Sequence, residues 1–163
     1  MKTALLPGTY DPVTVGHVDI IGRCSVMFDE VVVAVVDDSF RKSVLFKCEE
    51  RVHFLEESTK HLPNVRVTVM RNLVVKLARE VGASVLVKGL RALTDFEYEF
   101  QMAQLNRKLD SDLETMYLMA SPEYSFLSSS GVKEIARYGG NVSDLVPTVV
   151  WRRFAEMYGD VEG

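Results

Sequence analysis

Two glycines and a histidine near the start of the chain are spaced as in a site for a phosphorylated ligand. Gly8 and Thr9 follow a short apolar run, and Gly16 and His17 open an apolar pattern with helical spacing. Glycines let a backbone approach a ligand closely, and the free N–H groups of a helix N-terminus attract anions. Thr9 adds a hydroxyl, and His17 adds a donor that can carry charge near neutral pH. The pattern predicts a nucleotide-phosphate site; a cap or surface histidine is the alternative.

Further cations and hydroxyls follow other predicted strands. Lys88 and Arg91 flank a glycine turn, where a forked guanidinium suits phosphate oxygens and an ammonium acts as a point charge. A surface turn is the alternative there. Three serines, residues 128–130, begin a predicted helix. Because one serine is enough to cap a helix, three in a row indicate a phosphate site.

Strand-like apolar runs alternate with helical patterns along the whole chain. Strands are predicted near 4–6, 31–36, 65–69, 84–88 and 115–119, and helices near 18–28, 46–59, 73–81, 94–109, 128–138 and 147–158. This alternation predicts a single domain, residues 1–163, of the α/β class with a doubly wound parallel five-stranded sheet of Rossmann-like type. Such sheets bind ligands outside the carboxyl ends of their strands. That rule selects the loop to His17 and residues 37–46, 88–91 and 120–130.

Composition argues against several other classes of protein. The net charge of −4 disfavours a protein that coats nucleic acid. We expect no membrane-spanning segment and no signal peptide, because no apolar run is long enough and a strand begins at once. Cys24 and Cys48 lack the spacing of a metal site or a disulfide framework, which fits a reducing compartment. We therefore expect a cytoplasmic protein with no dedicated metal site and no nucleic-acid or membrane partner.

The first of these segments also resembles a family signature. Residues 7–17, Pro-Gly-Thr-Tyr-Asp-Pro-Val-Thr-Val-Gly-His, are similar to the motif of the small nucleotidyltransferases, above all the phosphopantetheine adenylyltransferases. Residues 88–91, 95–103 and 124–133 resemble further motifs of that family in the same order. The resemblance extends from about Lys2 to Trp151 and implies a nucleotidyltransferase fold.

The resemblance implies roles for individual residues. His17 is the expected catalytic residue, a donor to the α-phosphate in the transition state. The acceptor substrate is expected to contact Thr9, Lys42, Val74 and Lys88, with Val74 acting through its backbone. ATP is expected to contact Thr9, Tyr10, His17, Gly89, Leu90, Arg91, Glu99, Tyr124, Ser125, Phe126, Leu127, Ser128, Ser129 and Ser130.

Some of these assignments have alternatives. Residues 37–46 form a loop that is one residue longer than the common family pattern, so Arg41 competes with Lys42. Glu99 is about as readily a solvated helix residue. Phe96 and Phe100 share a helix face that packs either in the core or in a subunit interface.

The implied reaction transfers AMP from ATP to 4′-phosphopantetheine, giving dephospho-coenzyme A and pyrophosphate. A phosphate monoester has a second pKa of about 6 and is mostly ionised near neutral pH, so no general base is needed. Mg²⁺ is expected to arrive with ATP. The resemblance also implies a homohexamer and feedback by coenzyme A at the active site. The alternatives are a sister enzyme with another acceptor, such as nicotinamide mononucleotide or glycerol phosphate, and a silent nucleotide sensor. A sensor would have lost His17 or the cations, which this chain keeps.

Overall fold

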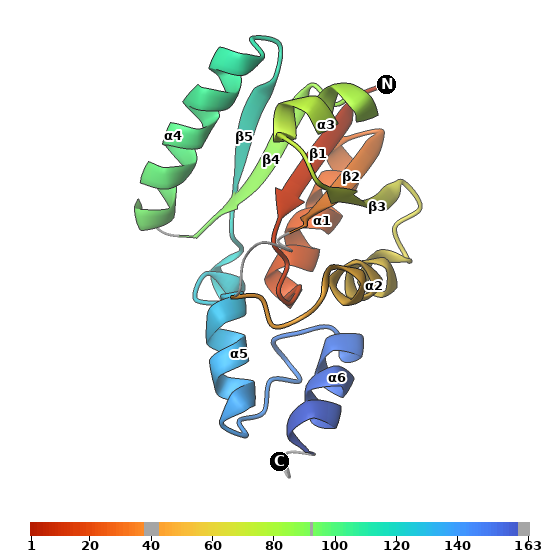
Figure 1. Ribbon diagram of the computed structural model, residues 1–163, viewed down its shortest axis with the longest axis vertical. Helices are drawn as coiled ribbons and strands as arrows, with labels where there is room; N and C mark the ends of the chain where they lie inside the picture. Colours follow the sequence, from red (N-terminus) through yellow and green to blue (C-terminus); the bar gives the residue numbers. More distant parts are fainter. Residues whose placement is uncertain (38–42, 92, 160–163) are drawn as a thin grey trace.

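The computed structural model of the protein describes residues 1–37, 43–91 and 93–159. Its centre is a parallel sheet, as the sequence predicted, with strands β1 (Thr3–Gly8), β2 (Glu30–Val36), β3 (Val65–Met70), β4 (Val85–Leu90) and β5 (Glu114–Met119). The strand order is β3-β2-β1-β4-β5 (Figure 1). The chain therefore winds outward from β1 in one direction to β3 and then crosses back to β4. The predicted five-stranded α/β fold is confirmed.

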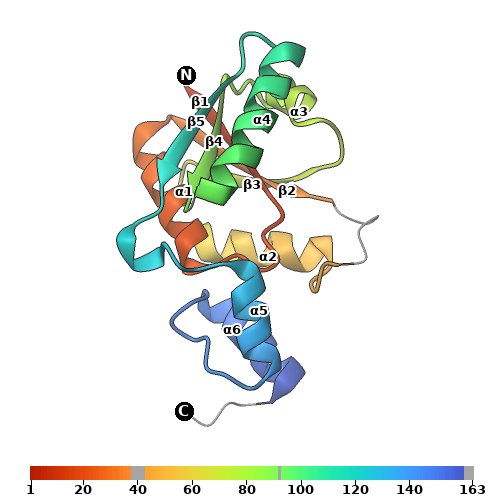
Figure 2. The ribbon, with the colours of Figure 1, turned by 90° about the vertical axis from the view of Figure 1, so that its left-hand side faces the viewer.

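The helices are α1 (Val15–Met27), α2 (Cys48–Thr59), α3 (Val74–Val81), α4 (Leu93–Leu109), the 3₁₀ turn η1 (Pro122–Tyr124), α5 (Ser129–Arg137) and α6 (Thr148–Tyr158). The carboxyl ends of the strands point toward α5, which lies beside α6 beyond the sheet (Figure 1). In Figure 2, α1 lies on one side of the sheet and α3 and α4 lie on the other.

Alternate residues of the central strands enter two separate cores. Leu6 and Val33 pack with Ile21 of α1 and Phe54 of α2 on one face. Leu5 points to the other face, where it packs with residues of α3. Because both faces are covered, residues 31–35 of β2 are fully buried, which explains their continuous run of Val and Ala.

The first strand is longer than predicted. We expected Pro7 and Gly8 to end it, but both pair with β2, opposite Ala34 and Val35. The pairing of β1 with β4 covers only Ala4 and Leu5. Pro7 is tolerated because, at its position, the ladder on the β4 side has already ended. The carboxyl halves of β1 and β4 therefore do not pair with each other, although each remains paired with its other neighbour, β2 or β5.

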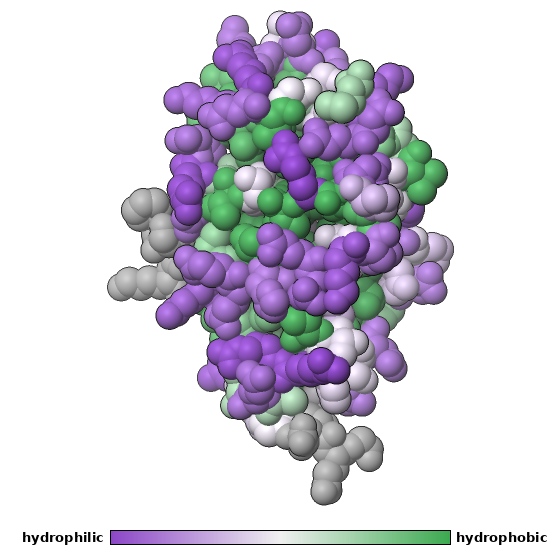
Figure 3. Space-filling model, turned by 90° about the vertical axis from the view of Figure 1, so that its right-hand side faces the viewer, coloured by the Kyte–Doolittle hydropathy of each residue, from purple (hydrophilic) through white to green (hydrophobic). Residues whose placement is uncertain are grey.

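Helix α4 carries apolar side chains at the surface. Phe96 is 41% exposed and Phe100 is 52% exposed, so of the two alternatives, core or subunit interface, packing in the core does not hold for the single chain. On the opposite side of the molecule, hydrophilic side chains cover much of the surface, with apolar areas between them (Figure 3). No helix in the described residues is long and apolar enough to cross a membrane.

Candidate active site

A cavity of about 340 Å³ lies where the carboxyl halves of β1 and β4 no longer pair with each other. This is the point at which the sheet changes its direction of winding, the usual ligand site of doubly wound sheets. Three of the four segments selected from the sequence line it: the loop to His17, residues 88–91 and residues 120–130. The fourth, residues 37–46, contributes no described residue to this cavity.

The sequence around Thr14 fixes the orientation of His17. Thr14 is the N-cap of α1, and its hydroxyl accepts the His17 backbone N–H at 3.4 Å. In return, the Thr14 backbone N–H donates to His17 Nδ1 at 3.0 Å. Because Nδ1 accepts a hydrogen bond, the ring proton of the neutral imidazole lies on Nε2. His17 is thus held as an Nε2–H donor.

The surroundings of His17 disfavour its charged form. Burial, followed by the positive charges of Arg91 and Lys88, lowers the pKa of the His17 imidazole to about 4. The sequence had indicated a donor able to carry charge near neutral pH. In the ligand-free protein the ring is instead neutral at that pH, because protonation would bury a charge next to two cations and cost Nδ1 its hydrogen bond.

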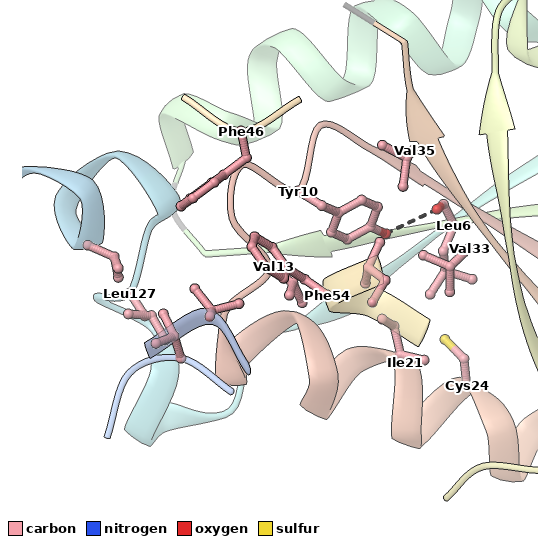
Figure 4. Close-up of a cluster of buried hydrophobic side chains, with 14 of the residues drawn as sticks. Leu6, Tyr10, Val13, Ile21, Cys24, Val33, Val35, Phe46, Phe54 and Leu127 are labelled. Carbon is pink, nitrogen blue, oxygen red and sulfur yellow. Dashed lines mark hydrogen bonds between the residues drawn. The ribbon is translucent and has the colours of Figure 1, made fainter. Parts of the chain in front are cut away.

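Tyr10 lies beneath the cavity and turns inward. Its side chain is 8% exposed, and its hydroxyl donates to the Leu6 carbonyl at 3.0 Å (Figure 4). Its ring meets the His17 ring edge-on, with 5.1 Å between the centroids. A Cβ atom on Gly8 would lie 2.9 Å from the Tyr10 ring, so this packing requires glycine at position 8. Tyr10 therefore supports His17 from below, and its hydroxyl is already used within the core.

The three serines at the start of α5 differ in the hydrogen bonds that their hydroxyls make. The Ser128 hydroxyl accepts the Gly131 N–H at 3.0 Å as the cap of α5. The Ser129 hydroxyl donates to the Pro12 carbonyl at 2.7 Å and so ties α5 to the first loop. The Ser130 hydroxyl has no hydrogen-bond partner among the described residues, and this residue is exposed. The sequence indicated a phosphate site from three hydroxyls; the structure engages two of them in holding the fold.

The other residues predicted to contact ATP fall into two groups. The cavity is lined by Gly89, Arg91, Glu99, Tyr124 and Leu127. The Arg91 guanidinium also donates to the Leu127 carbonyl at 2.6 Å, which links two of the segments. Four residues do not line this cavity: Thr9, Leu90, Ser125 and Phe126. The Phe126 side chain is 74% exposed.

A second cavity, of about 360 Å³, adjoins the first. The two share Pro7, Gly8, Lys88 and Glu99 as lining residues. The second one holds three of the residues predicted to contact the acceptor, namely Thr9, Val74 and Lys88. Its remaining lining is mostly apolar, from β2, β3, α4 and β5. Lys42, the fourth predicted acceptor contact, and its competitor Arg41 lie outside the described residues.

A predicted ATP contact and a predicted acceptor contact meet at the boundary between the cavities. Lys88 Nζ lies 3.4 Å from Glu99 Oε1, and both side chains are largely buried. The Tyr117 hydroxyl donates to the Glu99 backbone carbonyl at 2.7 Å, which fixes this part of α4 against β5. A phosphate placed against Lys88 would compete with the carboxylate for the ammonium.

Sequence reasoning missed three charged residues that hold these segments together. Asp11 is 4% exposed and accepts the Leu45 and Phe46 backbone N–H groups, each at 2.9 Å. It also pairs with Lys133 of α5 at 2.8 Å. Arg51 of α2 is 1% exposed. Helical spacing was the available signal for it, because Arg51 lies four residues before the apolar Leu55 in the predicted helix 46–59.

The described residues contain no group of three or more His, Cys, Asp or Glu side chains arranged to hold a metal ion. The cysteines Cys24 and Cys48 are both free thiols.

Comparisons with known proteins agree with this geometry. The profile of the cytidylyltransferase-like family matches residues 5–135. A phosphopantetheine adenylyltransferase from Thermodesulfovibrio yellowstonii is 52% identical over 149 residues, which cover 91% of this chain and 92% of the relative. One from Desulforudis audaxviator is 51% identical over 159 residues, covering 98% and 97%. The fold is also that of a proposed nicotinate-nucleotide adenylyltransferase from Vibrio parahaemolyticus, with a TM-score of 0.71, 18% identity and coverage of 94% and 99%.

Proposed function

Because the chain belongs to the phosphopantetheine adenylyltransferase family, we propose that its two adjoining cavities bring ATP and 4′-phosphopantetheine together for adenylyl transfer. The products are dephospho-coenzyme A and pyrophosphate. The observation that carries the proposal is the meeting of the cavities at Lys88, with the Nε2–H donor of His17 in the first cavity.

ATP occupies the first cavity in this proposal. The N-terminus of α5 offers backbone N–H groups and a partial positive charge to its phosphates. Arg91 supplies a guanidinium at the same wall. Glu99 offers carboxylate oxygens to a ribose hydroxyl or to the adenine amine. Mg²⁺ arriving with ATP would neutralise part of the phosphate charge, and the described residues offer no cluster of His, Cys, Asp or Glu side chains that would hold it by itself.

The acceptor occupies the second cavity, with its phosphate directed at the boundary. Lys88 provides the charge for that phosphate, and Thr9 provides a hydroxyl near it. The apolar part of this cavity, which includes Val74 and Met102, suits the uncharged pantetheine arm. Lys42 is proposed as a further contact of the phosphate on the strength of its place in the family motif.

The chemistry requires positioning and charge stabilisation more than proton transfer. An oxygen of the acceptor phosphate attacks the α-phosphorus and forms the new O–P bond. The bond from the α-phosphorus to the oxygen bridging to the β-phosphate breaks, and pyrophosphate leaves with the electron pair. No proton has to move, because the nucleophile is already ionised. His17 Nε2–H donates to an α-phosphate oxygen as negative charge accumulates there.

Replacement of His17 tests this role. His17→Ala should lower turnover by about three orders of magnitude, the scale of losing a preorganised donor to a developing oxyanion, with a milder effect on ATP binding. The exposed His53→Ala provides a matched control that should keep wild-type turnover. Turnover is measured as dephospho-coenzyme A formed, and ATP affinity by calorimetry. Near-wild-type turnover of His17→Ala would remove His17 from its proposed role.

A separate assay with a panel of phosphorylated acceptors, including nicotinamide mononucleotide and glycerol phosphate, distinguishes the proposed activity from that of sister enzymes that use another acceptor.

We also propose a homohexamer with coenzyme A as a feedback ligand at the active site. Exposed apolar side chains on α4 and β5 support an interface there: Phe96, Tyr98, Phe100, Leu105, Leu109, Met116 and Met119. Light scattering should give six times the chain mass of 18.4 kDa. Coenzyme A should inhibit competitively with the acceptor, because both would occupy the second cavity. We also propose a cytoplasmic localisation, because two free thiols are typical of proteins in a reducing compartment.

A further inference from the structure

Arg51 is the most deeply buried charged side chain in the described part of the chain, with 1% of its surface exposed. Its guanidinium donates to three backbone carbonyls from three different segments. Nε donates to Phe46 at 3.0 Å, and one terminal nitrogen donates to Thr9 at 2.7 Å and to Val36 at 2.9 Å. No carboxylate among the described residues pairs with it. Within the part of the chain that the structure describes, the positive charge is therefore balanced by carbonyl dipoles alone.

Such a charge is costly to bury, so its placement requires a reason beyond filling space. A methionine or leucine would fill a core position on α2 without that cost. What the guanidinium adds is a rigid fork that spans three backbones at once. Two of the carbonyls that it holds belong to Thr9 and Val36, and both residues line the second cavity. Arg51 thus fixes the carboxyl ends of β1 and β2 where they form the wall of that cavity.

The third carbonyl, that of Phe46, belongs to a peptide segment held from both sides. Asp11 accepts the Phe46 N–H at 2.9 Å, while Arg51 donates to the Phe46 carbonyl. Asp11 belongs to the same loop as Thr9, so the two buried charges together fasten this loop to the segment that precedes α2. The loop that carries Thr9 therefore depends on Arg51 for its position relative to β2.

We infer that Arg51 is a positioning residue for the acceptor substrate, because it holds the Thr9 backbone and the end of β2 in place. This inference rests on the proposed function. Because two of its three hydrogen bonds go to the wall of the second cavity and none goes to His17, Arg91 or α5, its removal should disturb the acceptor more than ATP.

Two variants and a control test the inference. Arg51→Lys keeps the charge but replaces the planar fork, and Arg51→Met removes the charge while keeping an unbranched apolar stem. Arg152→Met, at an exposed position on α6, is the matched control. The KM for 4′-phosphopantetheine should rise by about tenfold to a hundredfold in Arg51→Met, the scale of losing hydrogen bonds from a charged group. Arg51→Lys should fall between Arg51→Met and wild type.

The KM for ATP and the ATP affinity measured without acceptor should stay within about threefold of wild type in all three variants, well short of the tenfold that 1.4 kcal/mol produces. ATP binding also shows that the variants are folded. If the wild type makes no dephospho-coenzyme A, the proposed function fails first. If the wild type is active but the Arg51 variants raise both KM values alike, raise neither, or fail to fold, Arg51 belongs to the general core and the inference is overturned.

Discussion

Acidification from about pH 7 to about pH 5 should cost the folded protein about 2 kcal/mol through His17 alone. The pKa of this imidazole is lowered from 6.5 to about 4, first by burial and then by the charges of Arg91 and Lys88. A group whose folded-state pKa is lowered binds protons preferentially in the unfolded state. Its contribution is therefore fully present above the unfolded pKa and is lost as the pH falls toward the folded pKa. Over that window the loss approaches about 1.4 kcal/mol per pH unit.

The assay compares wild type with His17→Gln, which has no group that titrates at position 17. Urea unfolding of both proteins at the two pH values isolates the contribution of His17, because the other ionisable groups are common to both. The exposed His53→Gln serves as the matched control and should retain the wild-type difference.

NMR resonances of the imidazole rings measure the lowered pKa of His17 directly. Of the three histidines, only His17 lies in the cavity, so the exposed His53 and His61 provide internal reference signals. The His17 ring should remain neutral, with its proton on Nε2, until the pH approaches the lowered pKa of about 4. A His17 resonance that titrates at or above 6.5, or one with the proton on Nδ1, would refute the account of how Thr14 and the two cations control this ring.

Three further perturbations have outcomes set by packing and charge. Gly8→Ala places a Cβ atom 2.9 Å from the Tyr10 ring, so the free energy of unfolding, measured with urea, should fall by about 1–3 kcal/mol; an unchanged value would contradict the tight packing under His17. Ser128→Ala removes the cap of α5 and should lower the free energy of unfolding by about 1 kcal/mol, whereas Ser128→Asp, which can also cap, should recover much of it. Lys133→Met leaves the Asp11 carboxylate buried without its cation, and thermal and urea unfolding should show a loss of about 3–5 kcal/mol; a loss below about 1 kcal/mol, as for an exposed pair, would show that this bridge is unimportant.

The fold followed from the sequence because its signals are local and strong. Residues 31–35 form a continuous β-branched and alanine run because both faces of β2 are covered, and this distinguishes a central parallel strand from a half-exposed one. Gly82 ends α3 in a left-handed conformation, as a glycine after a helical pattern predicts. The positions of three candidate site segments followed in turn from the rule that ligands bind at the carboxyl ends of parallel strands.

The parts that could not be predicted depend on contacts between distant segments. Nothing in the serine run shows that the Ser129 hydroxyl is used by the Pro12 carbonyl, 117 residues away in the chain. The lowered pKa of His17 depends first on burial and then on the charges of Arg91 and Lys88, and these surroundings form only in the folded protein. The exposure of Phe96 and Phe100 also could not be read from periodicity, because an apolar helix face at the surface and one that enters the core have the same pattern.

The most direct test of the central claim is pyrophosphate release from ATP and Mg²⁺, measured with and without 4′-phosphopantetheine. We expect release only when the acceptor is present, with dephospho-coenzyme A formed in equal amount, because the acceptor phosphate must occupy the second cavity before the α-phosphorus can be attacked. Release of pyrophosphate without the acceptor, or bound ATP with no release when the acceptor is present, would contradict the claim that the two cavities together perform adenylyl transfer to this substrate.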